Sequence, residues 1–258
     1  YVADELNHCI RRIDSSGNVT TVAGSGIAGF ADADDATEGQ FLFPTGLAIL
    51  GNTLYVADRG NHRIRAFDVV SGGLSTVAGD GNAALLDGAG NTARFNNPTD
   101  VTVNSAGNIL VADRDNHCIR LIDLVSGNVT LLAGSEDAEA GNLDGSSTEA
   151  MFSSPSGLAV DSADNLYVAD RDNHLIRFVE PDGTTSTLAG SGAADSGDSP
   201  DSSTVSYLYP ATASSFDGPV ALALTSGGST TDVDYPILYL ADSGNSAVRE
   251  ISRDASLP

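Results

Sequence analysis

The sequence predicts an all-β fold, a β-propeller built from four-stranded antiparallel blades. The main observation is a fourteen-residue phrase that recurs five times: YVADELNHCIRRID from Tyr1, YVADRGNHRIRAFD from Tyr55, LVADRDNHCIRLID from Leu110, YVADRDNHLIRFVE from Tyr167 and YLADSGNSAVREIS from Tyr239. The residues between the copies also recur as a turn, a β-branched run, a loop rich in glycine and aspartate, and an apolar run. A unit of this size cannot bury both faces alone, so radial repetition is expected.

Each unit predicts four strands of about five residues, which we call a, b, c and d in chain order. In the second unit they are GLAIL (46–50), LYVAD (54–58), HRIRAF (62–67) and STVAG (75–79). Strand a is apolar almost throughout, which predicts an inner strand covered on both sides. Strand c carries one arginine per copy, expected to pair with acids of its own or an adjacent blade. These arginines are Arg11, Arg65, Arg120, Arg177 and Arg249.

The five units are expected to form a single propeller domain over residues 1–258, in which the first and last blades are incomplete. The first unit begins within strand b, and the last ends after strand c. Two alternatives follow: a portion of a six-bladed propeller or larger repeat protein, or five units that close irregularly. We favour the first.

The b–c phrase carries a resemblance to a known family. Asn173, His174 and Leu175 follow one another, Asn61-His62 and Asn116-His117 occupy matching positions, and Gly79 to Val103 looks like the connector between such repeats. With these residues the chain resembles the NHL-repeat family. The resemblance implies a propeller, usually six-bladed, but it implies no particular activity.

The charge of the chain limits its partners. Thirty-five acids against 12 bases give a net charge of −23, and all the bases are arginine. Such a surface repels nucleic acid and anionic membranes, and no apolar run approaches the roughly 20 residues of a membrane helix. Suitable partners are proteins, glycans, cations or further copies of the chain, and no nucleic acid or membrane insertion is expected.

Most of the candidate catalytic residues occupy positions of the repeat. The four histidines are copies of one position and should lie one blade apart, too far for a shared metal. The aspartates that end strand b should satisfy backbone groups in the b–c turn. We therefore expect a structural role for His8, His62, His117, His174, Asp58, Asp113 and Asp170.

The d–a loops differ between copies, so binding residues are sought there. Calcium accepts irregular oxygen-rich loops, and its candidate ligands are Asp32, Asp34, Asp35 and Glu38. No stretch fits an EF-hand, and solvated acidic loops remain the alternative. The candidate binding residues are Asp144, Glu149, Asp195, Asp198, Asp201, Tyr207 and Tyr209.

The function expected is a non-enzymatic binding or assembly module that presents an acidic loop face to a protein, glycan or cationic partner. The alternative is a metal-dependent enzyme, with calcium or zinc in the central channel. Some relatives of the family are zinc lyases with histidines near the inner strands, but the inner strands here contain none. For a lactonase-like calcium enzyme, Asp100 is the obvious inward-facing candidate. The alternative is that Asp100 is a polar residue that lines a water-filled channel.

Only a few residues bear on the cellular location of the protein. Cys9 and Cys118 are too far apart in the repeat to form a disulfide, which argues mildly against an oxidising compartment. The sequons NVT at Asn18 and Asn128 are glycosylation acceptors in a secreted protein, although Gly-Asn also suits the c–d turn. Together with the acidity, they favour an extracytoplasmic location.

Overall fold

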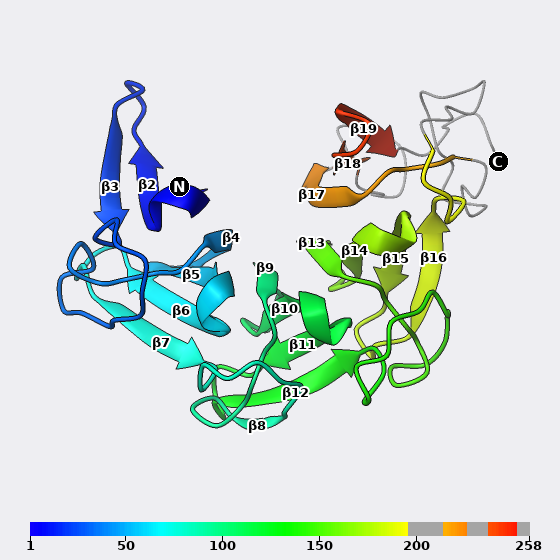
Figure 1. Cartoon of the computed structure of the whole chain (residues 1–258), viewed down its shortest axis with the longest axis horizontal. Helices are drawn as coiled ribbons and strands as arrows, with labels where there is room; N and C mark the ends of the chain where they lie inside the picture. Colours follow the sequence, from blue (N-terminus) through cyan, green and yellow to red (C-terminus); the bar gives the residue numbers. More distant parts are fainter. Residues whose placement is uncertain (196–213, 226–236, 252–258) are drawn as a thin grey trace. The chain divides into compact units, whose positions relative to one another are not determined.

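The chain is built from β-strands in the computed structural model, which describes residues 1–195, 214–225 and 237–251. Within these residues the strands form five separate antiparallel sheets, the blades of a β-propeller (Figure 1). The all-β propeller predicted from the repeat is therefore confirmed. In the described part of the chain, no helix is long and apolar enough to span a bilayer.

The first three blades follow the expected strand order. The first blade contains β1 (Val2–Asp4), β2 (Cys9–Ile13) and β3 (Val19–Ala23). The second contains β4 (Pro44–Leu50), β5 (Thr53–Asp58), β6 (Arg63–Asp68) and β7 (Leu74–Ala78). The third contains β9 (Pro98–Val103), β10 (Ile109–Asp113), β11 (Cys118–Ile122) and β12 (Asn128–Ala133), and a short β8 (Gly88–Ala89) pairs along the outer edge of β12.

The last two blades repeat the same meander. The fourth contains β13 (Pro155–Val160), β14 (Leu166–Asp170), β15 (Leu175–Val179) and β16 (Thr185–Ala189). The fifth contains β17 (Pro219–Thr225), β18 (Ile237–Asp242) and β19 (Ala247–Ile251). In blades two to five, strand a lies at one edge of its sheet and strand b lies beside it.

The residues pack as two compact units. The first comprises Tyr1–Leu131 and Glu136–Ala138, and the second comprises Leu132–Ser135 and Glu139–Pro258. Blades one and two and most of blade three belong to the first unit. The single domain expected over the whole chain stays a prediction.

The burial of strand a differs between blades. Five of the six residues of β13 are buried, as expected for a covered inner strand, whereas β4 and β17 keep several partly or fully exposed residues. Among the b strands, β10 and β14 are buried over all five residues, and each has a neighbouring strand on either side.

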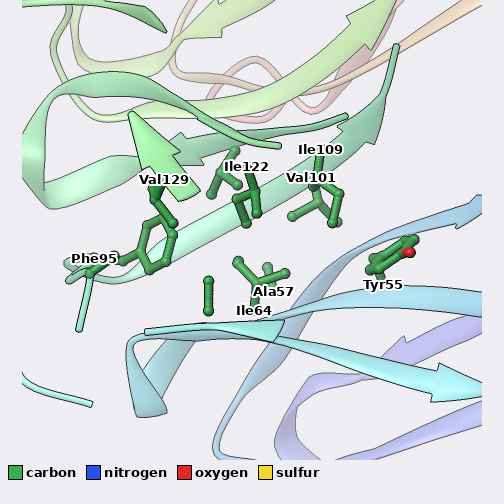
Figure 2. Packing of buried hydrophobic residues seen from close by; sticks show 11 residues of the cluster. Tyr55, Ala57, Ile64, Phe95, Val101, Ile109, Ile122 and Val129 are labelled. Carbon is green, nitrogen blue, oxygen red and sulfur yellow. The ribbon is translucent and has the colours of Figure 1, made fainter. Parts of the chain in front are cut away.

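Apolar side chains fill the space between neighbouring blades of the same unit. Between blades two and three, Ala57 and Ile64 face Val101, Ile122 and their neighbours (Figure 2). Phe95, from the loop that leads into β9, is fully buried in this cluster beside Val129. Burial of such a ring stabilises the fold by roughly 2–3 kcal/mol. Phe41 is buried in the corresponding place between blades one and two.

Neighbouring inner strands approach each other closely, and small residues permit the approach. The Thr45 hydroxyl of β4 donates to the carbonyl of Thr99 in β9 at 2.7 Å. Beside it, a Cβ added to Gly46 would overlap the Cα of Asp100. In the second unit, a Cβ added to Gly157 would lie 2.7 Å from the Cα of Ala221. The glycine in this position of strand a is therefore a packing requirement.

Replacement of Gly46 by alanine is expected to lower the free energy of unfolding by about 1–3 kcal/mol, because the methyl group meets backbone that cannot yield. Gly73→Ala is the matched control, since its Cβ would have no neighbour closer than 3.8 Å. Urea denaturation of both variants checks this. Equal midpoints for the two variants would show that the inner strands do not pack this tightly.

Candidate functional site on the loop face

The b–c turns and the d–a loops lie at the same ends of the strands within each unit, and we call this surface the loop face. Each b–c turn of the first four blades is one short 3-10 turn: Glu5–Asn7, Arg59–Asn61, Arg114–Asn116 and Arg171–Asn173. The following histidine adopts left-handed backbone, with φ between 53° and 56°. Histidine is one of the few residues that are enriched in this conformation. The d–a loops of the first three blades span residues 24–43, 79–97 and 134–154.

A buried aspartate organises the b–c turn in blades two to five. In the second blade, the Asp58 carboxylate is fully buried and accepts hydrogen bonds from the Leu42 N–H, the Asn61 amide and the Arg65 guanidinium. Asp113 and Asp170 make the corresponding bonds in the third and fourth blades. The aspartate thus joins its own blade to the loop arriving from the preceding one.

The arginine of strand c is buried with that aspartate. Arg65 donates to Asp58 at 2.8 Å, to Asp32 at 2.5 Å, and to the carbonyls of Ala31 and Gln40. Arg120 and Arg177 bind Asp87 and Asp144 in the same manner. We call this set the latch: the b-strand aspartate, the c-strand arginine, the loop aspartate and two loop carbonyls. The arginine pairing expected from the sequence is confirmed.

An aromatic ring completes each latch, and the sequence analysis missed it. The Arg65 guanidinium lies 5.4 Å from the Phe41 ring centroid, and the matching pairs are Arg120–Phe95, Arg177–Phe152 and Arg249–Phe216. The charge is attracted to the ring face. A signal was present, because Phe-x-x-Pro recurs at Phe41, Phe95, Phe152 and Phe216.

The histidines that follow the b–c turns accept hydrogen bonds from the d–a loops. The Nδ1 atom of His62 accepts the backbone N–H of Asn97 at 3.0 Å, and His8 and His174 accept those of Phe43 and Gly218. An acceptor at Nδ1 requires a neutral ring with its proton on Nε2. The donating residue precedes the proline of Phe-x-x-Pro and has left-handed backbone. These histidines therefore hold the entry to the next inner strand.

Burial dominates the electrostatics of the latch. It raises the pKa of Asp113 and of Asp170 to about 6, although Arg120 and Arg177 favour the charged carboxylates. Both carboxylates are still mostly ionised at pH 7. Burial also lowers the pKa of His62, with Arg63 acting in the same direction and Asp115 opposing it. A lowered pKa keeps the imidazole neutral, as its acceptor role requires.

The candidate calcium ligands lie in different environments. Asp32 binds Arg65 and the Thr76 hydroxyl, and Asp35 accepts the hydroxyl and N–H of Thr37, which lowers its pKa. Asp34 and Glu38 are exposed. Over the described ranges, no three or more acidic, histidine or cysteine side chains gather as a metal site. Calcium binding stays a prediction.

The candidate binding residues are only partly described. Asp144 pairs with Arg177, Glu149 accepts the Ser146 hydroxyl, and the carbonyl of Asp195 accepts the Asn245 amide. Asp195 and Glu149 are exposed. The remaining four candidates lie outside the described residues: Asp198, Asp201, Tyr207 and Tyr209.

The remaining candidates keep the places that the repeat gave them. Asp100 lies on the inner strand β9, where it packs against Gly46 and accepts the Val101 N–H. Asn18 and Asn128 are both exposed in the c–d hairpin, at the opposite ends of the strands from the loop face. Cys9 and Cys118 are buried free thiols, as predicted.

These features define a class: a β-propeller whose blades are fastened by a repeated latch. A comparison with protein families narrows this to the NHL repeat, whose family model matches residues 41–67, 95–120 and 152–177. Each match runs from the buried phenylalanine to the latch arginine, or two residues beyond it. The chain belongs to the NHL-repeat β-propellers.

Curated relatives agree with this family. The chain is 28% identical over 265 residues to Protein SUPPRESSOR OF QUENCHING 1, chloroplastic, from Arabidopsis thaliana, covering 97% of this chain and 23% of that protein. It is 30% identical over 291 residues to NHL repeat-containing protein 2 from Homo sapiens, covering 100% and 38%. The chain thus spans less than two fifths of the length of either relative.

A solved structure shows the same fold. A protein of unknown function from Bacteroides thetaiotaomicron superposes with a TM-score of 0.63 at 19% identity, covering 95% of this chain and 53% of that one. At this level of identity the likeness concerns the fold alone.

Replacement of Asp113 by alanine is expected to cost about 3–5 kcal/mol of unfolding free energy, because it leaves the buried Arg120 charge short of its main partner. Asp34→Ala removes an exposed carboxylate from a d–a loop and should change stability by less than about 0.5 kcal/mol. Denaturant titrations of both variants measure the difference. A loss below about 1 kcal/mol for Asp113→Ala would contradict the latch.

The Asp113 and Asp170 carboxylates are expected to titrate near pH 6 in carbon-13 NMR spectra of the folded protein. Because these pKa values are raised above those of the unfolded chain, the stability they contribute is complete below about pH 4. It is lost as the pH rises through 6. The free energy of unfolding of the wild type should therefore fall relative to Asp113→Asn between pH 4 and pH 6, and a rise would contradict the assignment.

Proposed function

We propose that the chain is a non-enzymatic binding module whose acidic loop face takes a basic protein partner. The observation that carries this proposal is that most of the described arginines are already paired with acids. Nine of the eleven described arginines form ion pairs, and the three most buried are enclosed in latches. Little positive charge is left to balance the acids of the surface.

Several loop-face carboxylates are exposed and form no ion pair with a described arginine: Asp34, Glu38, Glu136 and Glu139. Complementary charge steers an oppositely charged partner and strengthens its association. The same face contains exposed apolar side chains, among them Ile27 and Phe30 in the first loop. A surface that combines acids with such anchors suits a basic protein segment better than a free cation.

The chemistry of the site supports binding over catalysis. The recurring histidines, aspartates and arginines are engaged with backbone groups and with one another, so the repeat itself offers no free nucleophile or base. An extracytoplasmic location is part of the proposal, supported by exposure of both sequons. A stoichiometric metal in the purified protein would instead favour a metal-dependent enzyme.

Neutralisation of the loop face is expected to weaken binding of an arginine-rich test peptide at least tenfold and to reduce its salt dependence. The variant combines Asp34→Asn, Glu38→Gln, Glu136→Gln and Glu139→Gln. Isothermal titration at two salt concentrations measures the effect.

The matched control removes the same charge from the c–d turns, with Asp68→Asn, Asp123→Asn, Asp182→Asn and Glu180→Gln. These residues lie at the opposite ends of the strands. The control should bind the peptide as the wild type does. An equal loss in both variants would mean that net charge alone attracts the peptide and that the loop face is no binding site.

A further inference from the structure

The junction between the second and third blades combines a histidine, a carboxylate and a backbone in a disfavoured conformation, all within the first unit. The Nδ1 atom of His62 accepts the backbone N–H of Asn97 at 3.0 Å. The side-chain amide of Asn97 donates to the Asp115 carboxylate at 2.6 Å. His62 follows the b–c turn of the second blade, and Asp115 lies in the b–c turn of the third. We call His62, Asn97 and Asp115 the junction cluster.

The backbone of Asn97 is left-handed, with φ at 51°. The next residue is Pro98, and a residue before proline favours extended backbone instead. The chain on either side of Asn97 is fixed to the third blade, because the Asn96 N–H donates to the buried Asp113 carboxylate at 2.7 Å and Pro98 lies opposite Asp113 in the sheet. The disfavoured conformation is therefore confined to Asn97, where the two bonds of the junction cluster hold it.

The bond from the Asn97 N–H requires a neutral His62 ring. A protonated imidazole carries a hydrogen on both nitrogens, so its Nδ1 atom needs an acceptor and can no longer be one. The Asp115 carboxylate is an acceptor on the other side of the same junction, and its charge acts on His62. The cluster thus offers one set of partners to the neutral ring and another to the charged ring.

Few other charges surround the junction cluster. Arg63 follows His62 in β6, and the Arg114 guanidinium lies 3.7 Å from the Asp115 carboxylate. Each turn also contains the buried acid and arginine of its latch, which together carry no net charge. These two pairs are Asp58–Arg65 and Asp113–Arg120.

The environment of His62 sets the pH range in which the ring changes charge. Burial is the main cause that lowers its pKa, Asp115 opposes this effect, and Arg63 adds to it. Because the pKa is lowered, the bond from Asn97 is complete above the ordinary histidine value of about 6.5 and is lost as the pH falls through the lowered value. Arg63 is particular to this blade, since the other copies have Cys9, Cys118, Leu175 and Ala247 at its position.

We propose that the junction cluster is an acid-sensitive switch on the loop face. When a proton from solvent binds Nδ1 of His62, the ring releases the Asn97 N–H and donates to the Asp115 carboxylate in place of the Asn97 amide. Asn97 then relaxes toward extended backbone, and the entry to β9 separates from the second blade at the loop face. The apolar cluster between the two blades continues to hold them together. The inference concerns the junction itself and does not rest on the proposed binding function.

The test measures amide exchange by NMR in the whole nitrogen-15-labelled chain between about pH 7.5 and pH 4.5, with each rate corrected for the intrinsic rate at that pH. The protection of the Asn97 amide is expected to fall at least tenfold as the pH falls, with the same midpoint as the His62 ring signals. The amides of β10 should keep their protection, which separates a local release from global unfolding.

Two substitutions should move the midpoint in opposite directions. Arg63→Leu, which gives this blade the side chain of Leu175, removes a positive charge beside His62 and should raise the midpoint pH. Asp115→Asn removes the negative charge but keeps an acceptor for the Asn97 amide, so it should lower the midpoint pH. His62→Asn is the matched control, because asparagine tolerates left-handed backbone and does not titrate. It should abolish the pH dependence at Asn97.

Three results would overturn the proposal. The first is constant protection of the Asn97 amide while the His62 ring titrates, because the bond would then not depend on the charge of the ring. The second is an unchanged pH response in His62→Asn, which would make another group the sensor. The third is a parallel loss of protection in β10, which would mean that acid unfolds the third blade as a whole.

Discussion

The blades in this chain depend on a buried ion pair between the aspartate that ends strand b and the arginine of strand c. Both partners are removed from water, which costs several kcal/mol for each ion unless further hydrogen bonds compensate. The protein provides them through an asparagine, loop N–H and carbonyl groups, and a second aspartate. Arginine suits this position because its planar guanidinium holds five donors in a fixed geometry, whereas lysine has three donors on a flexible stem.

The latch explains why residues that look catalytic recur in every blade. An ion pair inside one blade would stabilise that blade alone, but this one also binds the loop from the preceding blade. It therefore orients each loop relative to the b–c turn, and the histidine fixes where the loop enters the next inner strand. The polar residues that obey the repeat build the scaffold. Exposed acids that vary between the loops, such as Asp34 and Glu38, take no part in it.

The same logic applies to the first blade, where the latch is half built. Arg11 keeps the aspartate of its own turn but has neither loop carbonyls nor ring around it. Val2, Ile13 and Val19 of this blade are exposed, whereas their equivalents in the second blade are buried.

The sequence by itself determined the strand order, the b–c turns and the scaffold role of the recurring residues, because each depends on contiguous residues that repeat. It missed the Phe-x-x-Pro rings, because their contact with the arginines joins residues that are far apart in the chain. Asp32 and Asp34 look alike in the sequence. Only the tertiary structure decided that Asp32 binds Arg65, 33 residues away, whereas Asp34 forms no ion pair with a described arginine. The physical reason is that this pairing depends on how a loop meets the next blade, which local sequence does not encode.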